Sequence, residues 1–208
     1  ILALQQFFVV KLFLFPAVRI SGTMPELPEL HGMAHVINVH AQGRIYDKCT
    51  KSSVTKLPRV NAPKGRFTIS AEARGKELRM TLQSEDTCKS VFILCNMGLT
   101  GFFEAVECVK AKHRHAHLSF RATDGTVLSF VDQMRFGSWH SMDTNEWSNG
   151  RGPDPVKEHD EFRLGVVNAI ATQPSKFKSK PICQVLHDQS LFNGIGNYLR
   201  AEILCRAG

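Results

Sequence analysis

Eight short runs of β-branched, aromatic and alternating residues between positions 44 and 141 limit what this chain can fold into. Turn signals such as Pro63-Lys64-Gly65 and Asp124-Gly125 separate several of them. Runs of this length and spacing are typical of antiparallel strands that pack in two layers. The sequence therefore predicts an eight-stranded antiparallel β-sandwich, with strands at 44–55, 66–73, 76–83, 90–96, 101–107, 115–122, 126–132 and 135–141.

Helical patterns flank this β-rich region on both sides. Apolar residues at 27, 30, 34, 37 and 41 recur at steps of three and four, which predicts an N-terminal amphipathic helix ending near Gly43. Beyond a Gly- and Pro-rich stretch, helices are expected at 156–171, 181–186 and 194–206. The predicted fold class is α+β, with a β-sandwich domain at 24–148, a linker at 149–155 and an incomplete helical domain at 156–208.

Residues 1–23 are strongly apolar but fit neither a membrane span nor a signal peptide. The stretch is short, Lys11 and Pro16 interrupt it, and no basic region precedes it. The chain also opens on Ile1 instead of methionine. We interpret residues 1–23 as an upstream extension or read-through to a start at Met24, with a genuine hydrophobic leader as the alternative. No contact with a membrane is expected.

Charge and cysteine content narrow the class of partner. The chain has 26 Lys and Arg against 19 Asp and Glu, and the formal net charge of +7 is compatible with a polyanionic partner. Its six cysteines are scattered without a CxxC pair. Reduced thiols and no zinc site are therefore expected, and no cysteine is a candidate site residue.

The hexapeptide at 24–29 is a candidate for covalent catalysis if Met24 starts the protein. Removal of an initiator methionine is favoured before a small residue, and it would leave Pro25 as a free secondary amine near the carboxylates of Glu26 and Glu29. An α-amine has a pKa of about 8, so a useful fraction is uncharged near neutral pH. Such an amine can attack an aldehyde-like carbon and form an iminium. A proline-rich loop before a helix is the structural alternative.

Four residues near predicted strand ends are candidate contacts, each with a plainer alternative. Lys76 follows a glycine turn and could hold a phosphate or sugar, although a solvated strand-edge lysine has the same pattern. Met97 would suit insertion into a base stack if its loop is exposed, and otherwise it fills the core. Arg135 and Phe136 suit a phosphate contact and stacking, with a buried Phe136 as the alternative.

Two further stretches bear on binding. His113, His115 and His117 alternate, so a strand would place them on one face. There they suit an edge facing phosphates, with a zinc site as the alternative. The glycines and asparagines at 193–197 stand immediately before an apolar helix. Because the first N–H groups of a helix lack partners within it, this turn is a ready anion site.

Together the segments MPELPE, RGKEL, NMGLTGFF, HRHAHL, MRFGSW and FNGIGNYLRAEIL resemble those of the Fpg/Nei family of bifunctional DNA glycosylases, in the same order and at similar intervals. The similarity runs from Met24 to the chain end and is nearest to the animal endonuclease VIII-like enzymes of the Nei-like 1 type. It implies that a helix-two-turn-helix domain follows the β-sandwich, with damaged double-stranded DNA in the cleft between them. It further implies a monomeric nuclear protein without a cofactor; single-stranded or bubble DNA stays open as a further substrate.

The resemblance implies catalytic roles for four residues. Pro25 matches the nucleophile that attacks C1′ of the damaged nucleotide, expels the base and leaves an imine. Glu26 matches the acid/base carboxylate, Glu29 a second carboxylate near the sugar, and Lys76 the lysine that contacts the sugar-phosphate. Elimination from the imine then cuts the strand on both sides of the sugar.

The resemblance also implies DNA contacts. Asn197 matches the phosphate-binding asparagine at a helix start, and Met97 matches the residue that fills the gap left by the flipped base, a flip that costs a few kcal/mol. His115, Arg135 and Phe136 complete the expected DNA-binding residues.

The sequence departs from the family in three ways. Met134 replaces one of the two arginines usual before Phe-Gly, which leaves the preference for the opposite base open. The chain stops before the rest of the helical domain and before a β-hairpin finger, zinc-bearing or zincless. The upstream residues would acylate Pro25. A DNA-binding protein without activity is thus the alternative to the enzyme, and a bacterial-type enzyme for oxidised purines is the alternative to one for oxidised pyrimidines.

Overall fold

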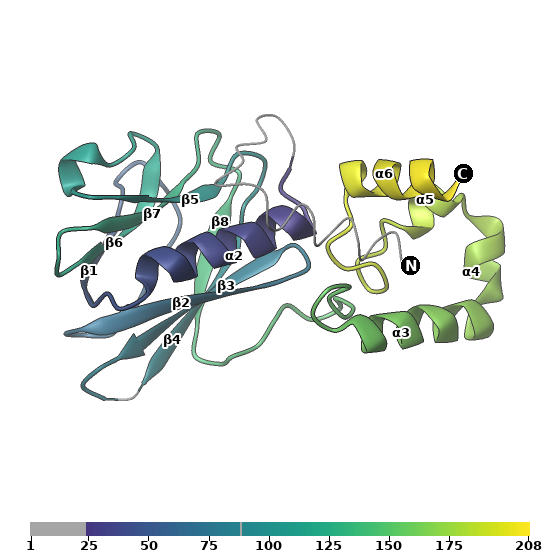
Figure 1. Ribbon diagram of the computed structural model, residues 1–208, viewed down its shortest axis with the longest axis horizontal. Coiled ribbons are helices and arrows are strands. Elements are labelled where there is room, and N and C mark those ends of the chain that lie inside the picture. Colours follow the sequence, from purple (N-terminus) through teal and green to yellow (C-terminus); the bar gives the residue numbers. More distant parts are fainter. Residues whose placement is uncertain (1–23, 88) are drawn as a thin grey trace.

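The structure is a computed structural model that describes residues 24–87 and 89–208. The interpretation of residues 1–23 as an upstream extension lies outside the described residues. Figure 1 shows a β-rich part beside a helical part, with helix α2 (Leu27–Ala41) lying along the sheet. The N-terminal end of α2 points toward the helical part, so the residues just before this helix lie where the two parts meet (Figure 1).

Helix α2 forms as its sequence predicts. Glu26 and Glu29 bond reciprocally in a capping box at its start, and the chain turns away at Gly43, which has φ +71°. The inward face buries its apolar residues against the sheet; they are Leu30, Ala34, Ile37 and Ala41. Burial of such a face stabilises a helix that would be marginal in isolation.

All eight predicted strands are present, and their pairing corrects the prediction of two separate sheets. Hydrogen bonds join them into one antiparallel sheet in the order β5-β7-β6-β1-β2-β3-β4-β8. Between β1 and β2 the register has only one residue pair, Tyr46 with Phe67. The strands are β1 (Tyr46–Lys51), β2 (Phe67–Arg74), β3 (Glu77–Ser84), β4 (Ser90–Asn96), β5 (Phe102–Val106), β6 (Ala116–Ala122), β7 (Val127–Val131) and β8 (Ser138–Met142).

The two halves of this sheet share a single hydrophobic core. Tyr46 of one half and Phe67 of the other stack with ring centroids 6.0 Å apart. Phe130 and Trp139 also meet across the halves, edge to face at 5.7 Å. The sheet therefore bends around one core, even though its hydrogen bonding is continuous.

The helical part contains four helices, one more than predicted. They are α3 (His159–Thr172), α4 (Pro174–Ser179), α5 (Ile182–Val185) and α6 (Asn197–Ala207), and a short 3₁₀ helix η1 (Val109–Ala111) lies between β5 and β6. Helix α4 was missed; its first residue is Pro174, which fits the start of a helix. Leu27 of α2 packs into the small core of this part with residues such as Phe192 and Leu199. The two parts therefore share buried apolar surface.

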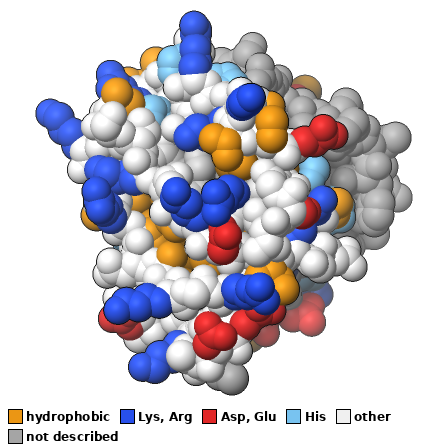
Figure 2. Space-filling model, turned by 90° about the vertical axis from the view of Figure 1, so that its left-hand side faces the viewer, with side chains coloured by type: hydrophobic (Ala, Val, Ile, Leu, Met, Phe, Trp, Pro, Cys, Tyr) orange, Lys and Arg blue, Asp and Glu red, His pale blue; other side chains and the backbone are white. Residues whose placement is uncertain are grey.

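Basic side chains do not gather at one place on the end of the sheet away from the helices. Figure 2 shows Lys and Arg spread over this face with acidic side chains between them. The net charge of +7 therefore does not by itself identify the face that binds a polyanion. Within residues 24–87 and 89–208, no helix has the length and apolarity needed to cross a membrane.

Candidate active site at the junction of sheet and helices

Glu26 is the residue that most directly joins the two parts. Its Oε2 accepts hydrogen bonds from the backbone N–H groups of Gly196 (2.8 Å) and Leu199 (3.1 Å), and its Oε1 accepts one from Tyr198 (3.1 Å). Helix α6 has no cap from its own side chains, so a carboxylate distant in sequence caps it. The side chain is only 2% exposed, and its negative charge lies at the positive end of the helix dipole.

Glu29 connects the start of α2 to the same turn of α6. Its Oε2 accepts the backbone N–H of Glu26 at 3.0 Å. The hydroxyl of Tyr198 lies 2.8 and 2.6 Å from the two carboxylate oxygens. Burial raises the pKa of Tyr198, and the charge of Glu29 raises it further. The hydroxyl therefore keeps its proton and donates to Glu29.

Lys76 reaches the same point from the sheet side. It follows the tight turn at Gly75 between β2 and β3, and its side chain is half-buried. A Cβ added to Gly196 would lie 2.5 Å from Nζ of Lys76 and 2.1 Å from Oε1 of Glu26. Burial lowers the pKa of Lys76, the charge of Glu26 opposes this, and Arg151 lowers it again. The ammonium and the carboxylate thus flank one backbone position at which an added side-chain atom would displace one of them.

The turns carrying these residues approach each other too closely for side chains. Gly75 has φ +59°, and a Cβ there would lie 1.9 Å from Oδ1 of Asn193. Gly194 has φ +93°, and a Cβ there would lie 2.7 Å from Cβ of Leu27. Both positions therefore require glycine for conformation and for space. We call the place where Glu26, Lys76 and the 194–196 turn meet the junction.

The remaining predicted residues of this site lie at the edge of the junction. Pro25 is half-buried, directly before Glu26, and its nitrogen is amide-bonded to Met24. Asn197 is exposed and is the first residue of α6. The structure thus brings together five residues that the sequence analysis selected separately; they are Pro25, Glu26, Glu29, Lys76 and Asn197.

A second group of predicted residues lies on the loop between β7 and β8. Arg135 and Phe136 are both exposed, Phe136 by 60% of its surface, and the neighbouring Met134 is exposed as well. The alternative of a buried Phe136 is therefore wrong. Arg135 has φ +60°, which is uncommon outside glycine. A surrounding constraint must hold this backbone conformation.

Asp132 supplies that constraint. Its buried carboxylate accepts the backbone N–H groups of Met134 (3.2 Å) and Gly137 (2.7 Å) and also the hydroxyl of Thr100. One carboxylate therefore fixes both ends of the Asp132–Gly137 loop and leaves its middle side chains in solvent. Sequence analysis did not select Asp132, although an Asp two residues before a turn is a known signal for such a cap.

Comparison with known proteins identifies the family. Residues 24–139 match the family model described as the formamidopyrimidine-DNA glycosylase N-terminal domain. The chain belongs to the formamidopyrimidine-DNA glycosylase family. It is 42% identical to endonuclease 8-like 1 of Mus musculus over 191 residues and 40% identical to endonuclease 8-like 1 of Homo sapiens over 191 residues. Formamidopyrimidine-DNA glycosylase of Nocardia farcinica is 28% identical over 201 residues.

Coverage of these relatives is unequal. The aligned region is 88% of this chain for both animal proteins but only 48% of the mouse and 47% of the human sequence. For the Nocardia protein it is 89% of this chain and 68% of the relative. This member of the formamidopyrimidine-DNA glycosylase family therefore spans about half the length of the animal relatives.

Met97 is not exposed, as the predicted contact with a base stack would require. Its side chain is 2% exposed and packs in the core of the sheet, although it lies at the end of β4 next to a loop. The structure agrees with the alternative prediction, in which Met97 fills the core. An apolar residue at a strand end can point either way, and here the core of the sheet includes it.

The three histidines do not alternate along a strand. His113 and His115 lie in the turn before β6, with ring centroids 5.5 Å apart, and only His117 belongs to the strand. His117 is buried, whereas His115 stays partly accessible beside Arg114, whose Nε donates to His115 Nε2 at 3.1 Å. Among the described residues no group of three or more His, Cys, Asp or Glu side chains is placed to hold a metal ion.

Asp154 is the residue of the site that sequence analysis missed entirely. It is fully buried in the segment before α3, and its Oδ2 accepts from His31 Nε2 (2.9 Å) and from the backbone N–H of Gly75 (2.7 Å). Its Oδ1 accepts the backbone N–H groups of Val156 (2.8 Å) and Lys157 (3.0 Å). One carboxylate therefore binds α2, the turn before Lys76 and the helical part.

These contacts outweigh the cost of burying the charge of Asp154. Burial alone raises the pKa of its carboxyl group, but the hydrogen bond and charge of His31 and the N–H groups of Gly75 and Lys157 lower it to about 2. The Asp154 side chain is thus ionised at neutral pH. No local sequence signal marks it, because a Gly-Pro-Asp-Pro stretch is also an ordinary linker.

Proposed function

We propose that this chain is a bifunctional DNA glycosylase and AP lyase of base excision repair, which removes oxidised bases, pyrimidines in particular. The convergence of Pro25, Glu26 and Lys76 with the start of α6 at the junction is the observation that carries the proposal. Schiff-base chemistry on a deoxyribose phosphate needs a nucleophile, a carboxylate and a cation. Here the first two are adjacent in one segment, and the cation comes from a second segment that is distant in sequence.

The proposed reaction starts from Pro25 as a free secondary amine. Its nitrogen attacks C1′, the glycosidic bond breaks, and the base leaves with a proton delivered under control of Glu26. The proline nitrogen loses its proton, the C1′–O4′ bond of the sugar breaks with protonation of O4′, and an iminium between the nitrogen and C1′ remains. The iminium acidifies C2′, so loss of the C2′ proton to solvent expels the 3′ phosphate, and loss of the C4′ proton in a second elimination expels the 5′ phosphate. No metal or cofactor takes part in these steps.

The other residues hold the DNA. The Lys76 ammonium lies beside Glu26 and is suited to the sugar-phosphate of the damaged nucleotide. Asn197, exposed at the start of α6, is suited to donate its side-chain amide to a phosphate. The backbone N–H groups beside it already donate to Glu26. Arg135, Phe136 and His115 are suited to backbone contact and stacking outside the junction. Met97 is left out because it is buried.

The expected partner is damaged double-stranded DNA bound by a monomer, with single-stranded or bubble DNA as a further substrate class to be tested. The animal relatives are named endonuclease 8-like 1 and the Nocardia relative is named formamidopyrimidine-DNA glycosylase, which supports this class of partner. We place the activity in the nucleus, as expected for a repair enzyme similar to mouse and human proteins.

Trapping of the imine tests the proposal. Mass spectrometry first establishes which residue is at the N-terminus of the expressed protein. Borohydride reduction with an abasic-site oligonucleotide should then give a covalent adduct only when Pro25 is N-terminal, and Pro25→Gly should weaken it. Adduct formation by protein that keeps Met24 and the residues before it would overturn the role of Pro25. Release of oxidised pyrimidines faster than oxidised purines tests the proposed substrate class.

A DNA-binding protein without activity is the second candidate. It is favoured by one observation, the amide bond between Met24 and the Pro25 nitrogen. An amide nitrogen cannot form an iminium. The two candidates differ in the trapping experiment, because the inactive protein would bind lesion-bearing DNA selectively and yield no adduct.

Lys76 offers a separate test of the junction. For Lys76→Ala we expect slower adduct formation at fixed salt with little change in melting temperature, because its ammonium would act on the substrate more than on the fold. A matched change at the exposed Lys64, Lys64→Ala, should leave both unchanged. A large melting shift for Lys76→Ala would make this lysine structural.

A further inference from the structure

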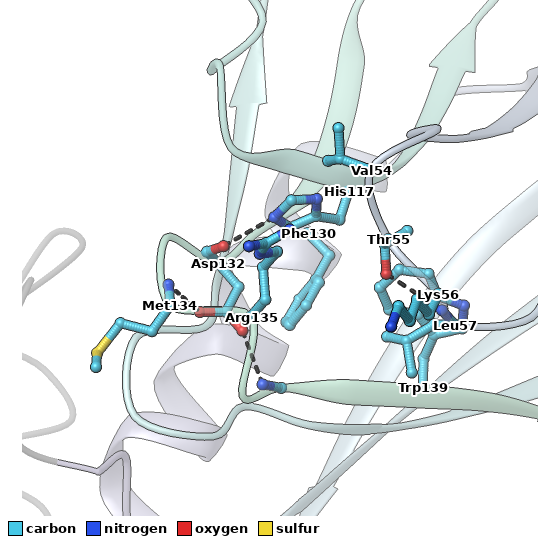
Figure 3. Close-up of a pocket in the computed structure, with 11 residues that line it drawn as sticks. Val54, Thr55, Lys56, Leu57, His117, Phe130, Asp132, Met134, Arg135 and Trp139 are labelled. Carbon is cyan, nitrogen blue, oxygen red and sulfur yellow. Dashed lines mark hydrogen bonds between the residues drawn. The ribbon is translucent and has the colours of Figure 1, made fainter.

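A pocket of about 370 Å³ lies behind the Asp132–Gly137 loop and shares no residue with the junction (Figure 3). Segment Val54–Leu57, which follows β1, forms one wall, and His117 contributes to the opposite wall. The rings of Phe130 and Trp139 line its inner end. The proposed reaction has no use for this pocket, although its rim includes the loop expected to contact DNA.

The Val54–Leu57 wall is held in place before any ligand binds. Nζ of Lys51 donates to the backbone oxygens of Thr55 at 2.9 Å and Leu57 at 2.7 Å. The indole N–H of Trp139 donates to the backbone oxygen of Pro58 at 3.0 Å. These bonds tie the wall to β1 and β8, so the pocket is a preformed part of the fold.

His117 lines this pocket and has an unused hydrogen-bond acceptor. Its Nε2 lies 2.8 Å from the backbone oxygen of Asp132, and because a carbonyl only accepts, Nε2 carries the hydrogen. In the neutral ring Nδ1 is then an acceptor. Nδ1 is buried without a hydrogen-bond partner among the described residues, and the whole residue is 4% exposed. Figure 3 shows the ring between Asp132 and the Val54–Leu57 wall.

The mouth of the pocket has a different chemistry from its interior. Lys56 and Arg135, both exposed, place two cations at the rim. The interior offers apolar and aromatic surface and the acceptor of His117. A phosphate alone would pair with the cations of the rim, but it has only acceptors, and Nδ1 needs a donor. A nucleotide satisfies both, with its base inside and its phosphate at the rim.

We propose that this pocket binds one unpaired nucleotide of DNA, whose base donates an N–H to His117 Nδ1 while its phosphate lies at Lys56 and Arg135. The Watson–Crick edge of each DNA base carries an N–H donor, and this donor is available only when the base is unpaired. The volume is at the small end of ligand sites, roughly 300–1,000 Å³, which suits a single nucleotide.

This inference rests on the proposed function, since swinging a damaged base out of a duplex leaves its partner unpaired. The pocket adjoins the loop that carries Phe136, so the unpaired nucleotide would arise next to it. A stretch of single-stranded DNA is a second source of the same chemistry. In the first case, the pocket would bind a nucleotide of the strand that the enzyme does not cut.

Binding to duplexes with a stable tetrahydrofuran abasic site tests the proposal. Opposite this site stands thymine, N3-methylthymine, which lacks the N3–H donor, or a second tetrahydrofuran without a base. We expect the wild-type dissociation constant to be about tenfold lower for thymine than for either other duplex. Val54→Trp should block the mouth and abolish this preference, since Val54 is 59% exposed at the rim and tolerates a larger side chain. Val39→Trp, at an equally exposed site on α2, should keep it.

Removal of a rim cation gives a second, independent measurement. Lys56→Gln should weaken binding of the thymine duplex and reduce its salt dependence by about one phosphate contact, whereas Lys64→Gln should not. A single-stranded oligonucleotide with one thymine among tetrahydrofuran sites separates the two sources. Val54-dependent binding of this oligonucleotide supports a single-strand source, and its absence supports the opposite strand.

The outcomes that overturn the pocket differ from those that overturn the proposed function. A thymine preference that survives Val54→Trp means that the base lies elsewhere. Selective binding of abasic duplexes with no thymine preference in the wild-type protein also overturns the pocket, but leaves the proposed function intact. Equal binding of abasic and undamaged duplexes by the wild-type protein overturns both.

Discussion

At the junction, the carboxylate of Glu26 is buried and accepts backbone N–H groups from another element, whereas on the Asp132–Gly137 loop the candidate DNA contacts are exposed. Glu26 is fixed by three N–H groups of a helix that is distant in sequence. The loop that carries Phe136 is fixed at its base, where the carboxylate of Asp132 accepts the N–H groups of Met134 and Gly137. The proposed reacting group is thus oriented by tertiary contacts, while the proposed DNA contacts are exposed side chains.

This difference has an energetic consequence. Changes to the groups that hold Glu26 should affect chemistry and folding together, because the same bonds orient this carboxylate and join the two parts of the molecule. Lys76 differs, since its ammonium is expected to act on the substrate more than on the fold. Changes at the middle of the loop should affect DNA binding and leave the fold intact. Four variants, given in decreasing order of expected effect, test this difference between the two regions.

The largest effect is expected for Glu26→Gln. Loss of the acid/base carboxylate should slow release of a damaged base about 10³-fold, while cleavage at a preformed abasic site should be spared. Single-turnover assays on both substrates measure this, with melting temperature as the check on folding. Equal loss of both activities would mean that Glu26 acts mainly as the cap of α6.

Gly196→Ala should come next. Its Cβ would lie 2.1 Å from Glu26 Oε1 and 2.5 Å from Lys76 Nζ, so one of these groups must move. We expect adduct formation to slow about 10²-fold, because small misplacements of reacting groups are costly. The control is Gly165→Ala in α3, where nothing lies within 4 Å; it should keep the rate and gain up to about 1 kcal/mol in unfolding free energy. Unchanged adduct rates for Gly196→Ala would show that the reaction does not depend on the exact positions of Glu26 and Lys76.

Asp154→Asn should affect stability in a pH-dependent way. The pKa of Asp154 falls from 3.8 to about 2 on folding, so its ionised form stabilises the fold above about pH 4, and this is lost as pH falls toward 2. The variant should lose roughly 2 kcal/mol at pH 7 in urea unfolding, with a gap that narrows below pH 4. The exposed control Asp143→Asn should change stability by under about 0.5 kcal/mol. A gap that does not depend on pH would contradict the role of the charge.

The smallest effect is expected for Phe136→Ala. Loss of one stacking ring should weaken binding of lesion-bearing DNA about tenfold, and stability should stay within about 0.5 kcal/mol of wild type. Fluorescence anisotropy and thermal melting measure the two quantities. Val109→Ala on η1, another exposed apolar side chain, is the control and should change neither. A large loss of stability for Phe136→Ala would place this ring in the fold and remove the contrast between the two regions.

Local patterns in the sequence predicted the elements because each pattern reports the surroundings of neighbouring residues. Helix α2 and all eight strands lie where the apolar spacing and turn residues placed them. Helix α4 was missed because Pro174 and the lysines around it carry no apolar period. The prediction of strand-borne His113 and His115 was wrong because alternation over five residues cannot distinguish a strand from the turn before it.

Which side chains face inward and which meet across the fold depended on tertiary structure. Met97 and Phe136 both lie beside strand ends, yet one is buried in the core and the other is exposed, because only one points between the two halves of the sheet. Asp154 carries no local pattern at all, and its role comes from His31 and Gly75. The sequence alone determined the elements and the chemical groups available. Only the fold decided that Glu26 lies at the start of α6. The two residues of this contact are 170 positions apart, and local spacing does not report contacts at such a separation.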